Sequence, residues 1–315
     1  MANIWYIQVN RYCNNSCHFC SNPSNGKNIT YERWIKLIDN FIKKSYRGII
    51  FTGWEPTLSP DLWRWILYTK QKWIENRIIS NGMKCSDYDF MKRLSDNGLE
   101  LVHFSVFSCY EQVHDFLSNT PWSWKKLMRS IANALKCWVR VQINTVINHY
   151  NQSHLDKTVI FLTKHFPQIQ HFVWNNLDPE MMRKTDIAWS TLPDYDIFKN
   201  SLTHAMKFLE SRGKTFRAEK VPLCYLNNFE YSSTETRKIV KNEERIIHFL
   251  DFRETIFEKW ENFFHEKPKE CNSCSLTPIC AGIYEHKKYY SNVKVYPRKL
   301  SKTDYKAILM KIYKD

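Results

Sequence analysis

The sequence predicts an α/β fold built around a parallel β-sheet, and three observations carry this prediction. Apolar runs of strand length alternate six times with amphipathic segments of helical length. The chain has 315 residues, of which 43% are hydrophobic, so it can bury a large core. Cysteine-rich or polar motifs follow several of the apolar runs. Because parallel strands joined by crossover helices gather their carboxyl ends at one edge, these motifs are expected to lie together.

Each strand is predicted from a short apolar run, and each helix from apolar residues that recur every three or four positions. The expected strands are residues 3–10, 48–52, 76–80, 100–106, 138–146 and 170–175. The expected helices are residues 30–45, 60–73, 86–97, 122–137, 152–166 and 194–212, with a basic helix at the end of the chain.

A loop with three cysteines follows the first predicted strand. Cys13, Cys17 and Cys20 lie in RYCNNSCHFCSNPS, with C-x3-C-x2-C spacing. Three thiolates can hold three irons of a [4Fe–4S] cluster, which leaves the fourth iron open to a small chelating ligand. A zinc site that uses His18 as its fourth ligand is the alternative.

The second motif, TGWEPTLSP, follows the second predicted strand, GIIF. Together the two motifs resemble the radical S-adenosylmethionine (radical SAM) superfamily, in which the open iron binds the amino and carboxylate groups of SAM. The resemblance implies that Gly53 and Glu55 receive the SAM ammonium group, since a carboxylate is a strong acceptor. The family usually has glycine where this chain has Trp54, and tryptophan is strained if that position requires a positive φ.

Polar residues also end the later predicted strands. The resemblance implies that Ser105 contacts the SAM ribose and that Asn144 lies on the adenosine side. Ordinary turn chemistry is the alternative for both residues. His114 and Asp115 have a pattern common in relatives, and helix capping and catalysis stay open for them, so no catalytic acid or base is assigned. Further polar residues at strand ends are Ser80, Asn81, Gly82, Asn175 and Asn176.

Four cysteines form a second group in the last third of the chain: Cys224, Cys271, Cys274 and Cys280. Four thiolates suit either a zinc ribbon or a closed [4Fe–4S] cluster. Following a radical SAM barrel, they resemble the auxiliary-cluster extensions called SPASM and twitch. Tyr284 occupies the place of the last SPASM cysteine, so a single auxiliary cluster is expected. The intervening segment, residues 232–251, is expected to form an amphipathic helix or a helix pair.

The resemblance covers residues 4–215 and 216–297. It implies a partial (β/α)6 TIM-like barrel over residues 1–215, then a cysteine-rich, twitch-like extension with a C-terminal helix over 216–315. Cys85, Cys109 and Cys137 stand apart from both groups and are expected to be buried structural thiols.

Composition is typical of a cytoplasmic enzyme. Ten cysteines without a signal peptide favour metal or cluster binding over disulfides, and no apolar run reaches the length of a membrane span. The net charge of +14 indicates either an acidic partner, such as a nucleic acid, an acidic peptide or a reductase, or simply a lysine-rich solvated surface. No Lys/Arg block is long enough for a nucleic-acid-binding tail.

The sequence therefore predicts an iron–sulfur oxidoreductase with two [4Fe–4S] clusters that cleaves SAM to a 5′-deoxyadenosyl radical. The radical would remove hydrogen from the substrate, and a peptide that is oxidised or crosslinked is the leading expectation. Alternatives are a small metabolite such as a sugar or nucleotide and, more distantly, a zinc-ribbon protein that binds nucleic acid. Expected partners are an electron donor such as flavodoxin or ferredoxin and a separate peptide-recognition protein, since the first strand starts at residue 3.

Overall fold

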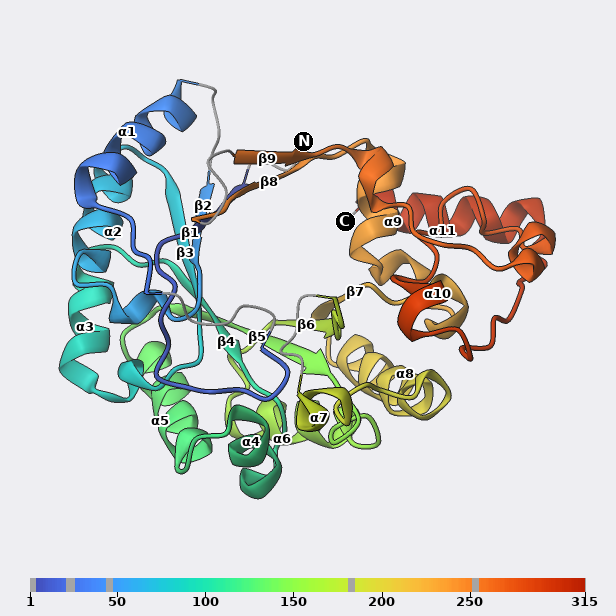
Figure 1. The fold of residues 1–315 in the computed structure, drawn as a ribbon, viewed down its shortest axis with the longest axis horizontal. Coiled ribbons are helices and arrows are strands. Elements are labelled where there is room, and N and C mark those ends of the chain that lie inside the picture. The colour runs from blue at the N-terminus through green and yellow to red at the C-terminus, as the bar shows by residue number, and fades with distance from the viewer. Residues whose placement is uncertain (1–3, 21–25, 44–47, 181–184, 251–254, 315) are drawn as a thin grey trace.

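The computed structural model centres on a single curled sheet of nine strands in the order β7-β6-β5-β4-β3-β2-β1-β8-β9 (Figure 1). It describes residues 4–20, 26–43, 48–180, 185–250 and 255–314. The strands are β1 (Ile4–Gln8), β2 (Gly48–Thr52), β3 (Glu75–Ser80), β4 (Leu101–Ser105), β5 (Arg140–Ile147), β6 (His171–Asn176), β7 (Thr215–Glu219), β8 (Arg245–His248) and β9 (Thr255–Glu258). Neighbours are parallel throughout except β8 and β9, which are antiparallel.

The helices are α1 (Tyr31–Ile42), α2 (Leu62–Gln71), α3 (Tyr88–Asp96), α4 (Glu111–Ser118), α5 (Ser123–Lys136), α6 (Leu155–His165), α7 (Asp186–Trp189), α8 (Tyr195–Ser211), α9 (Thr234–Lys241), α10 (His286–Tyr289) and α11 (Lys302–Lys314). Helices α1 to α6 and α8 lie along the outside of the curled sheet, whereas α9, α10 and α11 gather in a separate group (Figure 1). Several helices begin at a side chain that accepts backbone N–H groups, as Thr30, Asp87 and Asp194 do at α1, α3 and α8.

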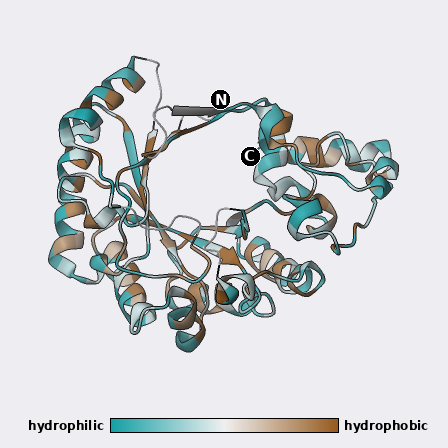
Figure 2. Cartoon of the chain, in the orientation of Figure 1, coloured by the Kyte–Doolittle hydropathy of each residue, from teal (hydrophilic) through white to brown (hydrophobic). Residues whose placement is uncertain are grey.

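The core lies between the sheet and these helices. Trp34 of α1 and Trp65 of α2 are fully buried and stack with ring centroids 5.4 Å apart. Both tryptophans also lie against Phe51 of β2. Figure 2 shows hydrophobic residues along the strands, whereas the helices carry both hydrophobic and hydrophilic turns. This pattern is expected for helices that bury one face and expose the other.

The structure confirms the predicted α/β class and all six strand–helix units. The first residue of the expected first strand and the last two of the expected first helix lie outside the described residues. The C-terminal helix is present as α11. No described helix has both the length and the apolar character that a membrane span requires.

The expectation for residues 232–251 is wrong in its second half. Only α9 is helical, and it ends at Asn242, which has a left-handed φ of +52°. Ile246 and Ile247 instead lie in β8, where they pair with Trp5 and Tyr6 of β1. The reason is tertiary: β1 is the first strand of the barrel and offers a free edge, and β-branched residues suit a strand.

Three strands were not anticipated: β7, β8 and β9. The expected domain boundary at residue 215 coincides with the first residue of β7, which extends the parallel sheet beside β6. The two later strands, from the C-terminal part of the chain, add to the opposite edge through β1. The sheet therefore brings residues from the cysteine-rich third of the chain beside the N-terminal strand (Figure 1).

Candidate functional site

A cavity of about 610 Å³ lies where the strands end, inside the curl of the sheet. This volume falls within the range of about 300–1,000 Å³ that is common for ligand sites. Its lining includes the thiols of the N-terminal loop and polar residues from the ends of five strands: Cys13, Cys17, Cys20, Ser80, Asn81, Ser105, Asn144, Asn175, Asn176, Glu219 and Lys220. The predicted convergence of the strand-end motifs is therefore observed.

The cysteine loop is held against α4 by backbone hydrogen bonds. Ser16 N–H donates to the Ser118 carbonyl and His18 N–H to the Leu117 carbonyl, each over 3.1 Å. The ring of His18 packs against Phe116, with centroids 5.0 Å apart, and His18 does not line the cavity. This placement favours the three thiols alone as the ligand set, without His18, which is the fourth ligand that a zinc site on this loop would use.

Cys13 receives two hydrogen bonds at its sulfur. Asn15 N–H donates to Sγ over 3.3 Å, and the side-chain amide of Asn81 donates over 3.4 Å. Burial raises the pKa of the Cys13 thiol to about 11. Such a thiol ionises readily only beside a cation, and N–H groups aimed at sulfur are typical of cluster ligands.

Glu55 is placed differently from the expectation that it meets the SAM ammonium. Its side chain is fully buried and does not line the cavity. Oε1 accepts from the Thr57 backbone N–H (3.1 Å) and hydroxyl (2.6 Å) and from the Ser80 hydroxyl (2.8 Å), while Oε2 accepts from Asn81 N–H (2.7 Å). Burial raises the pKa of Glu55, and these donors oppose the rise. The carboxylate thus ties the loop after β2 to the loop after β3.

Gly53 and Trp54, by contrast, line the cavity directly. Gly53 has a φ of +122°, and a Cβ there would lie 2.6 Å from the Asn10 carbonyl oxygen, so only glycine fits. Trp54 is not among the described residues with positive φ, so the strain considered from the sequence does not arise. The Arg11 guanidinium lies 5.1 Å from the Trp54 ring centroid. Backbone carbonyls of this segment are the acceptors available beside the cluster loop.

Ser105 and Asn144 are neighbours across β4 and β5 and line the same cavity. Asn175 of β6 donates its amide to the Asn144 side-chain oxygen, which fixes the orientation of Asn144. Asn176 donates to the Tyr195 hydroxyl and so connects the cavity to α8. The ends of β4, β5 and β6 therefore form one polar strip along the cavity.

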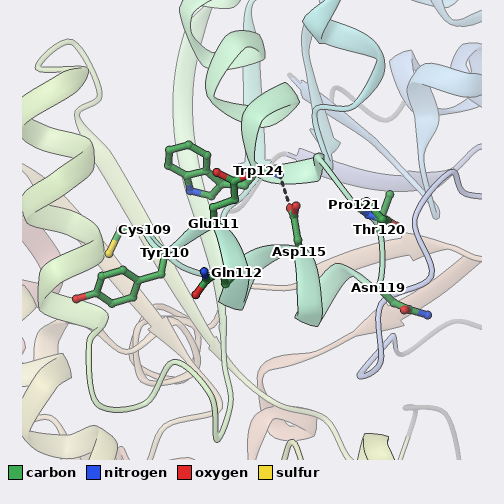
Figure 3. A pocket seen from close by; sticks show the side chains of 9 residues that line it. All are labelled: Cys109, Tyr110, Glu111, Gln112, Asp115, Asn119, Thr120, Pro121 and Trp124. Carbon is green, nitrogen blue, oxygen red and sulfur yellow. Dashed lines mark hydrogen bonds between the residues drawn. The ribbon is translucent and has the colours of Figure 1, made fainter.

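His114 and Asp115 have structural roles. Asp115 accepts from the backbone N–H groups of Trp122 and Trp124 and from the Ser123 hydroxyl, each over 2.7 Å, and so caps α5. The buried His114 accepts the Phe107 N–H. Asp115 also lines an open hollow of about 850 Å³ formed by the α4–α5 region (Figure 3). That hollow contains no cysteine of either predicted ligand group.

Sequence reasoning missed a charged wall on the far side of the cavity. Glu219 Oε1 and Arg245 Nη2 form an ion pair of 3.0 Å. Asp178 Oδ2 pairs with Lys220 Nζ at 2.6 Å and accepts from the Tyr284 hydroxyl at 3.1 Å. Glu219 and Lys220 stand at the end of β7, just as the other site residues stand at the ends of their strands. The alternation of polar and apolar residues in TFRAE is the sequence signal that could have predicted this strand.

The four C-terminal cysteines converge on a separate cavity of about 30 Å³, which Leu276 and Ile283 also line. Gly282 N–H donates to Cys280 Sγ and Arg298 N–H to Cys274 Sγ, each over 3.3 Å. Burial raises the pKa of Cys224 to about 12. All four are free thiols. The set is half-buried and rich in sulfur, it has an apolar surrounding, and N–H groups are directed at it, which fits a metal–thiolate centre.

In neither cysteine group are the thiols arranged as the ligands of a single metal ion. Across the described residues, no three or more His, Cys, Asp or Glu side chains are arranged to hold one metal ion. A [4Fe–4S] cube is wider than one tetrahedral ion, so its thiolates stand farther apart. The expectation of a [4Fe–4S] cluster at each group is consistent with this spacing.

Comparison with known proteins agrees with this geometry. Residues 7–162 match the model of the radical SAM superfamily. An AdoMet-dependent heme synthase from Oleidesulfovibrio alaskensis is 27% identical over 149 residues, which is 46% of this chain and 38% of that protein. Thus the match spans well under half the length of this curated relative. The chain therefore carries a domain of the radical SAM superfamily, whose members are enzymes.

Solved structures share the fold over most of the chain. The structure of anSMEcpe with bound AdoMet and the Kp18Cys peptide has a TM-score of 0.67 at 15% identity and covers 99% of this chain and 97% of that chain. Streptococcus suis SuiB bound to the precursor peptide SuiA has a TM-score of 0.63 at 14% identity, covering 89% of this chain and 71% of that chain. At these identities, the likeness concerns the fold.

Proposed function

We propose that this chain is a radical SAM oxidoreductase that removes hydrogen from a peptide substrate and so oxidises or crosslinks it. The observation that carries the proposal is the shared cavity: three cysteine thiols and the polar ends of successive strands line the same space. A cavity with a cluster at one side and polar groups along the rest can hold both SAM and one substrate group.

The chain's own residues supply binding and orientation. Cys13, Cys17 and Cys20 would hold a [4Fe–4S] cluster. Backbone acceptors of Gly53 and Trp54 would meet the SAM ammonium. When bound, the reduced cluster and SAM supply a 5′-deoxyadenosyl radical that takes hydrogen from an unactivated carbon.

The polar strip would orient the adenosine part of SAM. Ser105 would face the ribose, and Asn144, held by Asn175, would present a fixed amide on the adenosine side. A fixed donor or acceptor costs less ordering on binding than a mobile one, because its rotamer is already set. This arrangement supports the assignment of Ser105 and Asn144 to SAM.

A second [4Fe–4S] cluster is proposed at Cys224, Cys271, Cys274 and Cys280, within the extension that follows the barrel. Four thiol ligands leave no iron open to substrate, which suits outer-sphere electron transfer. A peptide substrate is supported by the two solved neighbours, whose structures contain peptides. An electron donor such as flavodoxin or ferredoxin would reduce the first cluster, and a separate protein would present the peptide.

Iron and sulfide analysis after anaerobic reconstitution tests this proposal. The wild type should hold about eight irons and eight sulfides per chain, and replacing Cys13, Cys17 and Cys20 together by alanine should leave about four of each. With dithionite, the wild type should convert SAM to 5′-deoxyadenosine, and the triple variant should not. Bound zinc without sulfide in the wild type would refute the proposal.

A further inference from the structure

One part of the cavity wall is acidic. Glu219 of β7, Glu235 of α9 and Glu258 of β9 line it with Arg245 of β8, beside the paired Lys220 and Asp178. Arg245 already pairs with Glu219, so its charge is compensated. The chain as a whole is strongly basic, with a net charge of +14. A local excess of carboxylates in this cavity is therefore a specific feature and not the general character of the protein.

Arg245 Nε has no hydrogen-bond partner among the described residues, and Glu235 is a carboxylate of this wall whose bonding is also incomplete. It is only 4% exposed, and its Oε2 accepts no hydrogen bond from any of the described residues. Burial raises the pKa of Glu235, the Glu219 carboxylate raises it further, and Arg245 opposes both. A buried carboxylate oxygen without a donor is unfavourable and calls for an explanation such as a ligand.

The cation one helical turn away on α9 donates no hydrogen bond to Glu235 Oε2. Lys238 lies one helical turn further along α9, and its ammonium lies over the Phe263 ring, 4.6 Å from the centroid. Burial lowers the pKa of Lys238 to about 8, with Arg245 adding to the fall. Lys238 does not line the cavity, whereas Phe263 and Ile247 do.

We propose that Glu235 binds a cationic group of the substrate, an ammonium or guanidinium carried on an aliphatic stem, as in a lysine or arginine side chain. The stem would lie along Ile247 and Phe263, and the charged head would donate to the free oxygen of Glu235. Long cationic side chains combine an apolar stem with a charged head in this way. The proposal rests on the cavity being the substrate site of the function proposed above, and it names the chemistry of that substrate.

Binding measurements on the full-length, anaerobically reconstituted protein test the proposal. The probes are Nα-acetyl-L-lysine N-methylamide and its norleucine counterpart, which has a similar stem without the charge. The wild type should bind the lysine probe at least tenfold more tightly in calorimetric titration. In Glu235→Gln, which keeps the side-chain volume, this preference should disappear.

The matched control is Glu230→Gln. Glu230 is also a buried glutamate, 2% exposed, but it pairs with Arg298 and does not line the cavity. This variant should keep the wild-type preference for the lysine probe. The comparison of the two probes in the wild type does not depend on how well either variant folds.

n-Pentylamine distinguishes the source of the cation. Binding as tight as that of the lysine probe indicates a free amine metabolite, and weaker binding indicates a lysine side chain within a peptide. Equal binding of the lysine and norleucine probes by the wild type, binding of neither, or a preference that survives in Glu235→Gln overturns the proposal. Cluster content and SAM cleavage are measured on the same samples, so a failure of the proposed function is seen separately.

Discussion

Replacing Glu55 by glutamine separates a structural role of this residue from a role in SAM binding. The buried carboxylate accepts four hydrogen bonds, from Thr57, Ser80 and Asn81. Glutamine preserves the volume but replaces one oxygen by an NH2 group. If that group takes the place of Oε2, it faces the N–H of Asn81, which then has no acceptor.

The expected loss is that of one hydrogen bond to a charged group, about 1.5–3 kcal/mol of unfolding free energy. At about 2–4 °C per kcal/mol for a large domain, the melting temperature should fall by roughly 3–12 °C. The assay is thermal unfolding of the anaerobic apoprotein without SAM, followed by circular dichroism. Glu32→Gln, at an exposed position in the first turn of α1, is the control and should change stability by less than about 0.5 kcal/mol.

SAM affinity of the reconstituted variant completes this experiment. If the carboxylate serves the fold, apoprotein stability falls, and any change in affinity follows from a displaced loop. An unchanged melting temperature together with tenfold weaker SAM binding would refute this reasoning. That result would assign the carboxylate to the SAM ammonium, as the family resemblance implies.

Three further predictions follow from single contacts. Asn81→Asp removes an N–H donor from the sulfur of Cys13, so the reduction potential of the cluster on that loop should become more negative in an EPR-monitored titration. An unchanged potential would exclude the contact. Gly53→Ala should lower the unfolding free energy measured in urea more than Gly213→Ala does. Both glycines have a positive φ, but of the two only Gly53 has a backbone oxygen where the added Cβ would lie. Equal losses in the two variants would contradict the clash. Burial lowers the pKa of His114 to about 4, so its contribution to stability is full above pH ~6.5 and falls toward pH 4, by about 1.36 kcal/mol per pH unit. His114→Gln should flatten the urea-derived stability profile over that range, and a slope identical to the wild type would refute the assignment.

The sequence by itself determined the six strand–helix units and the position of the motifs along them. The apolar periods of these segments are local, and parallel strands with crossover helices have few possible arrangements, so the shared cavity followed from motif positions alone. Cys13, Cys17 and Cys20 line the cavity with Ser105 and Asn144 as the pattern required.

Tertiary structure alone decided which groups face that cavity and which support it. Glu55 belongs to a recognisable motif, yet its carboxylate is turned toward the segments that follow β2 and β3, because four donors from these segments surround it. Ile246 and Ile247 fit a helical pattern, but the free edge of β1 makes them a strand. That pairing carries Arg245 to the acidic wall beside Glu235. The pairing of β1 with β8 joins residues more than two hundred positions apart, and no local pattern encodes it.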